Sequence, residues 1–192
     1  MSDPANQLAE PDPVRQVCWT RVVHTVGTGA IFERRARKYQ RLVRGPAFLG
    51  VVVPSVVGTM VLAWGANAAS RPIVLWTAGI LATLQIVLSV WALVARWDSS
   101  LAYALDSAAE NHRLAAQFER LARTPPSDLQ MRFDLLDAAY QARSDSDVKQ
   151  VVSSSEKRFG LRSGLHRIQR PCVECGKIPV PDDPSLCSVC GR

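Results

Sequence analysis

Two long runs without a charged side chain constrain the fold of this 192-residue chain more than any other feature. Residues 45–70 and residues 72–95 contain no Asp, Glu, Lys or Arg, and only Arg71 separates them. The hydrocarbon core of a bilayer is about 30 Å thick, and a helix of about 20 residues crosses it. We therefore expect an all-α membrane protein with a two-transmembrane helical hairpin, whose spans lie at about 46–66 and 73–95.

The residues that flank the first run predict its orientation. Residues 1–12 are acidic and contain prolines, so they lack the basic and apolar regions of a cleaved signal peptide. Basic side chains gather just before the span, at Arg34, Arg35, Arg37, Lys38, Arg41 and Arg44. The connecting loop, about 66–72, holds only Arg71. Since Lys and Arg concentrate on the cytoplasmic side, we expect both termini in the cytoplasm.

Changes in composition and the positions of helix-breaking residues divide the chain into five segments. They are a flexible N-terminus (1–12), cytosolic or interfacial basic helices (13–44), the two-transmembrane hairpin (45–97), cytosolic helices (98–168) and a small zinc ribbon (171–192). Within the second segment, Gly27 and Gly29 predict a break between two helices, because glycine disfavours helix interiors.

The cytosolic segment carries apolar residues at helical spacing, which predicts amphipathic helices. The first stripe comprises Leu101, Leu105, Ala108, His112, Ala115 and Phe118. A second stripe comprises Leu129, Phe133, Leu136 and Tyr140. Between them, Thr124-Pro125-Pro126 predicts a helix end and Ser127 a helix N-cap. The run Ser-Asp-Ser-Asp at 144–147 predicts a further break before a more polar helix that runs to about Ile168.

Four of the five cysteines lie near the C-terminus as two Cys-x-x-Cys-Gly motifs. They are Cys172, Cys175, Cys187 and Cys190, with 11 residues between the pairs. Two such knuckles supply four thiolates in a tetrahedron, which is the donor set of a structural Zn²⁺ site. A segment this short cannot bury a core, so metal binding should supply its folding free energy.

Three other interpretations of these cysteines are weaker. Stable disulfides are rare in a reducing cytoplasm, and redox Cys-x-x-Cys motifs normally occur singly within a βαβ pattern. An iron–sulfur cluster could also use four thiolates, although glycine-backed twin knuckles favour zinc. The remaining cysteine, Cys18, is expected to be a small buried side chain.

No catalytic arrangement is visible. His24, His112 and His166 lie far apart in sequence, and there is no P-loop, paired-carboxylate site or nucleophile elbow. With four protein ligands, the zinc site leaves no position for an activated water. We therefore do not expect an enzyme.

The two spans carry small and polar residues on defined faces. These pore-lining or helix-packing candidates are Gly50, Pro54, Ser55, Gly58 and Thr59 in the first span and Gln85 and Ser89 in the second. Small residues let helices approach closely, and an amide in hydrocarbon needs a partner. Simple packing of the hairpin and a pore or oligomer interface both explain the pattern. Two helices cannot enclose a water-filled pathway, so a channel would require a homo-oligomer.

These motifs together carry a resemblance. Cys18-Trp19, the stretch from Gly27 to Ala36, the hairpin and the cysteine tail resemble the bacterial mobilome CxxCx(11)CxxC proteins. The hairpin with its flanking helices is similar to the SLATT domains, which are SMODS- and SLOG-associating two-transmembrane effectors. The resemblance implies a mobile element or antiviral defence, the bacterial inner membrane, and a pore-forming effector linked to nucleotide-signalling partners. It carries over no catalytic residue.

Two functions therefore stay open. The first is an oligomeric pore-forming effector that its cytosolic helices and zinc ribbon regulate, with a cytosolic protein or a nucleotide-signalling system as partner. The second is a membrane-anchored adaptor whose ribbon recruits protein or nucleic acid. The basic segment 157–170 could bind nucleic acid, but contact with anionic lipid is the simpler explanation beside a bilayer.

Overall fold

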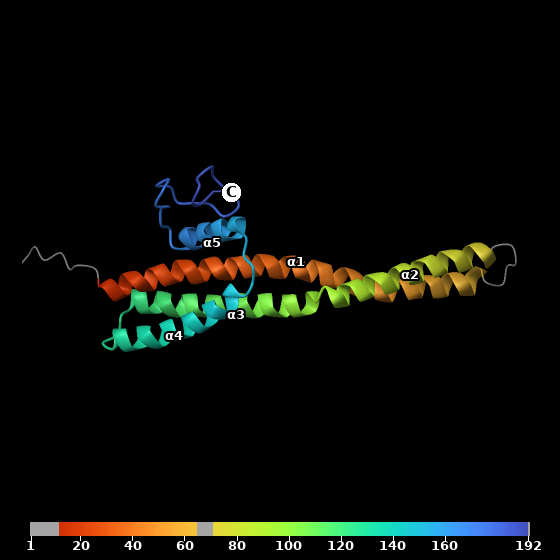
Figure 1. Ribbon diagram of the computed structural model, residues 1–192, viewed down its shortest axis with the longest axis horizontal. Helices are drawn as coiled ribbons and strands as arrows, with labels where there is room; N and C mark the ends of the chain where they lie inside the picture. Colours follow the sequence, from red (N-terminus) through yellow and green to blue (C-terminus); the bar gives the residue numbers. More distant parts are fainter. Residues whose placement is uncertain (1–11, 65–70, 192) are drawn as a thin grey trace, which may run out of the picture. The chain divides into compact units, whose positions relative to one another are not determined.

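A computed structural model describes residues 12–64 and 71–191, and helices are the only regular elements among them. They are α1 (Pro13–Trp64), α2 (Arg71–Val94), α3 (Trp97–Arg123), α4 (Leu129–Val148) and α5 (Ser154–Arg167) (Figure 1). The predicted N-terminal lead-in, apart from Asp12, and most of the predicted connecting loop lie outside the described residues.

The chain forms two compact units. One, here called the helical unit, comprises residues up to Arg34 together with Leu105 onward, and it contains α4 and α5. The other, here called the hairpin unit, runs from Arg35 to Ala104 and contains α2. Helices α1 and α3 contribute residues to both.

Helix α1 is continuous, so the predicted break at Gly27 and Gly29 is wrong. Both glycines are buried inside the helix, and each makes room for a neighbour. A Cβ atom on Gly27 would lie 2.7 Å from the carbonyl oxygen of Gly160 in α5. A Cβ atom on Gly29 would lie 3.1 Å from the ring of His112 in α3. These glycines therefore serve close helix packing, where the gain in packing offsets their low helix propensity.

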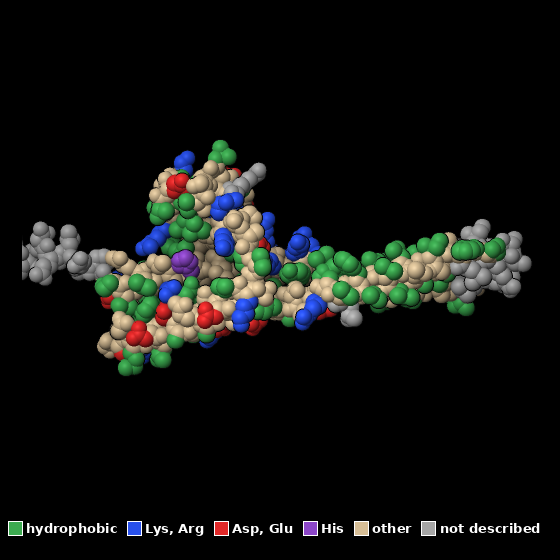
Figure 2. All heavy atoms as spheres, in the orientation of Figure 1, with side chains coloured by type: hydrophobic (Ala, Val, Ile, Leu, Met, Phe, Trp, Pro, Cys, Tyr) green, Lys and Arg blue, Asp and Glu red, His purple; other side chains and the backbone are tan. Residues whose placement is uncertain are grey.

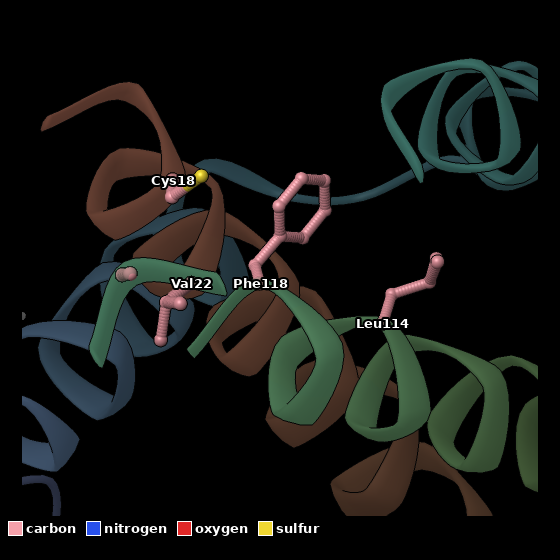
Figure 3. Packing of buried hydrophobic residues seen from close by; sticks show 5 residues of the cluster. Cys18, Val22, Leu114 and Phe118 are labelled. Atoms are coloured by element: carbon pink, nitrogen blue, oxygen red, sulfur yellow. The ribbon is translucent and has the colours of Figure 1, made fainter. Parts of the chain in front are cut away.

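The core of the helical unit lies between α1 and α3. Its fully buried residues are Cys18 and Val22 from α1 with Leu114, Phe118 and Ala122 from α3 (Figure 3). The predicted burial of Cys18 is thus confirmed.

Helix α4 covers this core with the stripe that its sequence predicts. Phe133, Leu136 and Tyr140 pack against the cluster, and Leu129 is buried. The Phe118 ring meets the rings of Phe133 and Tyr140 with centroids 6.2 Å apart in both pairs. Such tilted aromatic contacts add to the burial of apolar area.

The predicted stripe of α3 is only partly right. Ala108, Ala115 and Phe118 are buried, but Leu105 keeps 55 % of its surface exposed and His112 is exposed too. The buried face is shifted because it also includes two polar residues, Ser107 and Asn111. A prediction from hydrophobic periodicity ignores such polar residues, so the predicted stripe is displaced by one position from the observed buried face.

Those two residues explain why the predicted break at 144–147 is also wrong. Helix α4 continues to Val148 because Asp147 is buried and accepts hydrogen bonds from Ser107 Oγ and Asn111 Nδ2, both at 2.8 Å. Arg143 pairs with the same carboxylate at 3.1 Å. A buried carboxylate is stable only with partners of this kind.

The helix starts also differ from expectation. Asp128, rather than Ser127, precedes α4, and its side chain caps no backbone N–H. Helix α5 begins after Ser153, which forms a reciprocal capping box with Glu156. The break between the second and third cytosolic helices therefore lies at about 149–153 rather than at 144–147.

In the hairpin unit, α2 lies beside the second half of α1 (Figure 1). One contact between them joins Gly50 and Gln85, since a Cβ atom on Gly50 would lie 3.3 Å from Gln85 Nε2. Hydrophobic side chains gather along the part of this unit that holds α2 (Figure 2). Large exposed ones on α2 are Trp76, Ile80, Leu84, Ile86, Val87, Val90, Trp91 and Val94.

Among the described residues, the helical stretch Pro13–Thr59 contains a segment that is long and apolar enough to cross a bilayer. None of that segment is buried within the chain. A shorter apolar stretch, Trp76–Trp91, lies in α2.

Candidate metal centre

The structure brings the four C-terminal cysteines together. The Sγ atoms of Cys172, Cys175, Cys187 and Cys190 all lie within 4.8 Å of one another. Metal–sulfur bonds of about 2.3 Å in a tetrahedron place neighbouring sulfurs about 3.8 Å apart. The Sγ atoms of Cys175 and Cys190 are 3.7 Å apart, so this donor set fits one tetrahedral ion. A multi-iron cluster holds irons and inorganic sulfides between its thiolates, which requires a wider spacing.

A glycine behind each cysteine pair shapes the turn. Gly176 has a φ of +67°, a left-handed conformation that favours glycine, and its N–H donates to the Cys172 carbonyl oxygen at 2.9 Å. Gly191 serves a different need, because a Cβ atom there would lie 2.1 Å from the Cys187 carbonyl oxygen. Its N–H donates to that oxygen at 2.8 Å. Each glycine thus lets the backbone fold back beneath the sulfurs.

Glu174, which the sequence analysis did not single out, joins the two knuckles. It lies between the first two cysteines and accepts hydrogen bonds from Ser188 Oγ at 2.7 Å and from Val189 N at 3.1 Å. These bonds, with a third from the Cys187 thiol, lower the pKa of the Glu174 carboxyl group. The carboxylate therefore holds the second Cys-x-x-Cys turn against the first.

The thiols differ in acidity before a metal binds. Hydrogen bonds from the backbone N–H groups of Cys175 and Glu174 lower the pKa of Cys172 to about 7. Burial, together with the neighbouring sulfurs, raises the pKa of Cys190 to about 12. Close thiolates repel one another, so the cluster carries its full negative charge only with a cation among the sulfurs.

The ribbon (residues 171–191) contacts α5 through two residues. Arg162 is buried, and its Nη1 donates to the carbonyl oxygen of Cys190 at 3.1 Å and to that of Gly191. Burial lowers the pKa of Arg162. His166 Nδ1 lies 3.1 Å from the carbonyl oxygen of Pro179, between the two knuckles. No local sequence pattern marks either residue, because their partners lie 13 to 29 positions away.

The predicted pore-lining or helix-packing candidates of the hairpin unit do not all lie in one place. Gly50 and the half-buried Gln85 meet between α1 and α2, while Pro54, Gly58 and Ser89 are exposed. The exposed hydroxyls of Ser55 and Thr59 each donate to a carbonyl oxygen of their own helix at 2.8 Å.

Comparison with known proteins gives one family. No curated protein and no solved structure gives a significant match. The family described as "Mobilome CxxCx(11)CxxC protein" matches residues 15–192, which includes α1 from its third residue, all of α2 to α5 and all four clustered cysteines. The chain belongs to the mobilome CxxCx(11)CxxC protein family.

Proposed function

We propose that this protein is a two-span protein of the bacterial inner membrane that acts as a non-enzymatic, oligomeric, pore-forming effector. Its helical unit and its zinc ribbon lie in the cytoplasm and regulate the pore. Membership of a mobilome family places the chain with mobile elements, and antiviral defence is the role that we propose for it there.

The observation that carries this proposal is the exposed apolar surface of the hairpin unit. Trp76 keeps 75 % of its surface exposed, and Trp91 and Val94 more than 60 % each. A soluble protein rarely exposes so extended an apolar surface, whereas hydrocarbon solvates it. The uncharged lengths of the two helices match two crossings.

Small residues on the outside of the hairpin support an oligomer. Apart from the local backbone of its own helix and its chain neighbours, neither Gly58 on α1 nor Gly79 on α2 has a described atom within 4 Å of its Cβ position. Ser55 and Thr59 lie on the face adjacent to that of Gly58, and their hydroxyls are already satisfied by the helix. Surfaces of this kind allow close approach of helices in lipid, which favours association with further copies.

The resemblance to SLATT domains supports the pore. Two helices cannot enclose an aqueous path, so a conducting state needs several hairpins. The four-thiolate cluster supports Zn²⁺ as the resident ion, held by Cys172, Cys175, Cys187 and Cys190 in a structural role.

Membrane potential after induction of the full chain in bacteria tests this function. A voltage-sensitive dye should report depolarisation by the wild type. The double variant Gly58→Leu/Gly79→Leu, which fills both open positions, should abolish it. Gly45→Leu is the matched control, because Gly45 also has nothing within 4 Å but precedes the first predicted span. Equal depolarisation by all three proteins would contradict an oligomer built on these faces.

A second variant tests the polar residues of α2. Gln85→Leu/Ser89→Leu removes an amide and a hydroxyl from the span without adding a charge. If these groups line the pore, depolarisation should disappear at equal membrane expression. Unchanged depolarisation would assign Gln85 to packing within the hairpin.

A membrane-anchored adaptor is the second candidate, and the position of Gln85 favours it. The amide faces Gly50 inside the hairpin, which leaves a mainly apolar exterior suited to simple anchoring. If the protein is an adaptor, the full chain should capture a cytosolic partner through the zinc-loaded ribbon. The membrane potential of the same cells should stay unchanged. Capture should then be lost with Cys172→Ser/Cys175→Ser and kept with Gly58→Leu/Gly79→Leu.

A further inference from the structure

One buried cation connects the cysteine cluster to helix α5. Arg162 lies within α5 and exposes only 6 % of its surface. Its guanidinium donates to two successive carbonyl oxygens, those of Cys190 and Gly191, at the end of the second knuckle. We propose that Arg162 is a positioning residue of the metal centre, and that through it metal binding controls the docking of the ribbon on α5.

The two carbonyl oxygens are in place only when the knuckle is formed. Gly191 is fixed by the hydrogen bond from its N–H to the Cys187 carbonyl oxygen and by the close approach of these backbones. Among the described residues of the ribbon, only Cys172, Pro179, Cys190 and Gly191 are buried. Since the ribbon has almost no apolar core, the metal must hold this geometry. Loss of the ion therefore removes the acceptors of Arg162.

Charge acts in the same direction. Four thiolates and a divalent cation leave a net charge of about −2 on the centre, and the Arg162 guanidinium lies directly behind one ligand. A buried cation without partners is unstable, so Arg162 must become hydrated when the knuckle opens. Hydration requires the ribbon to leave this face of α5.

Helix α5 does not depend on the ribbon for its own position. A Cβ atom on Gly164 would lie 2.3 Å from the Val23 carbonyl oxygen of α1, and Gly160 meets Gly27 in the same close way. This backbone contact anchors α5 on α1. The ribbon is therefore the part that is released, and its release uncovers Arg162, whose guanidinium carbon lies 5.8 Å from the ring centroid of Phe159.

Metal dissociation from the full chain in detergent tests the proposal. The protein is loaded with Co²⁺, whose thiolate absorption reports four-sulfur ligation, and excess chelator then removes the ion. Arg162→Met keeps the length of the side chain and removes the hydrogen bonds. Loss of a residue that orients metal ligands typically weakens binding about 10- to 100-fold, so we expect dissociation to accelerate by about that factor.

Arg167→Met is the matched control. It removes the same side chain from the same helix, but Arg167 is largely exposed and pairs with Glu119 at 3.6 Å. Its dissociation rate should stay within about twofold of the wild type, as expected for an exposed pair. If Arg162→Met fails to fold by circular dichroism, Arg162→Lys replaces it. Lys keeps the positive charge but lacks the planar guanidinium group. The rate of metal dissociation from the Lys variant should therefore lie between that of the wild type and that of a chain without this contact.

Hydrogen exchange supplies a readout that a merely stabilising residue would not move. Removing the ion from the wild type should increase exchange both in the ribbon and in the Arg162 turn of α5, while exchange in α1 stays unchanged. Arg162→Met should uncouple the two, so that metal changes exchange in the ribbon alone. Equal dissociation rates for Arg162→Met and Arg167→Met, or an α5 that does not respond to metal in the wild type, would overturn the proposal.

The proposal rests on the metal binding proposed above, and the experiment separates the two. Failure of the wild type to develop the Co²⁺–thiolate absorption would refute metal binding itself. A normal spectrum with identical rates for the two Arg variants would refute only the role of Arg162.

Discussion

The two units bury their side chains by opposite rules. The helical unit places Cys18, Val22, Leu114 and Phe118 inside, and its buried charged groups have partners, such as Arg143 for Asp147 and backbone carbonyl oxygens for Arg162. The hairpin unit leaves most of its large apolar side chains outside, and the hydroxyls of Ser55, Thr59 and Thr83 donate to carbonyl oxygens of their own helices. This contrast is what the proposed membrane embedding of the hairpin unit predicts, because water favours an apolar interior, whereas hydrocarbon does not and requires every polar group to be satisfied locally.

Glycine illustrates the same difference. In the helical unit, Gly27, Gly160 and Gly164 lie at helix crossings where a single Cβ atom would meet backbone atoms. In the hairpin unit, Gly45, Gly58 and Gly79 have no described neighbour within 4 Å. Glycine therefore serves close internal packing in the first unit, whereas in the second these three glycines leave open space and only Gly50, among the described ones, meets a neighbour inside the hairpin.

Removing metal ligands should give the largest effect. Cys172→Ser/Cys175→Ser should reduce metal binding from one ion per chain to none, because structural Zn²⁺ sites contribute about 10–16 kcal/mol of apparent binding free energy. Elemental analysis of the purified full chain measures the stoichiometry. Cys18→Ala, which changes a cysteine of the core instead, should keep one ion. An ion retained by the double variant would refute the four-sulfur centre.

Replacing one phenylalanine in each unit tests the contrast in burial. Phe118→Ala should lower the free energy of unfolding of the helical unit by about 3–5 kcal/mol, because Phe118 is fully buried. Phe48→Ala, at a site with 67 % of its surface exposed, should change it by less than about 0.5 kcal/mol. Pulse proteolysis of the full chain in detergent across a urea series measures both. Equal effects would mean that the two units share one core.

The effect on stability of replacing a glycine with alanine should have opposite signs in the two units. Gly27→Ala should destabilise the helical unit by about 1–3 kcal/mol, because the new Cβ atom meets Gly160 backbone atoms at 2.7 Å. Gly45→Ala, with open space around it, should be neutral or stabilise α1 by up to about 1 kcal/mol. The same proteolysis assay compares them. A stabilising Gly27→Ala would show that α5 does not lie against this turn of α1.

The smallest effect concerns the start of α5. Ser153→Ala removes the capping box with Glu156 and should cost about 1 kcal/mol. Ser154→Ala, one position along and outside the capping box, should change stability by only a few tenths of a kcal/mol. Hydrogen exchange of the first turn of α5 distinguishes the two. Similar exchange in both variants would exclude the cap as a stabilising element.

The sequence predicts those features that depend on local pattern. Charge-free runs, the apolar stripe of α4 and the cysteine spacing are all visible within short windows, and the structure contains an apolar hairpin, the stripe and a four-sulfur cluster. Their physical causes, span length, helical periodicity and ligand spacing, act over a few turns of chain.

What the sequence did not predict depends on distant partners. Gly27 resembles a helix breaker until Gly160 is known to cross it, and Asp147 resembles part of a break until Ser107 and Asn111 are found beneath it. Arg162 looks like one more basic surface residue, yet its partners lie 28 and 29 positions away. Pairing of this kind leaves no periodic trace in a single sequence.

Cysteine labelling in intact cells tests the central claim, a two-span hairpin with both termini in the cytoplasm. Ser70→Cys lies in the predicted outer loop, and Asp98→Cys follows the second span. A membrane-impermeant maleimide should label the chain with Ser70→Cys in intact cells, but the wild type and Asp98→Cys only after lysis. Labelling of Asp98→Cys in intact cells, or of neither variant until lysis, would contradict the account.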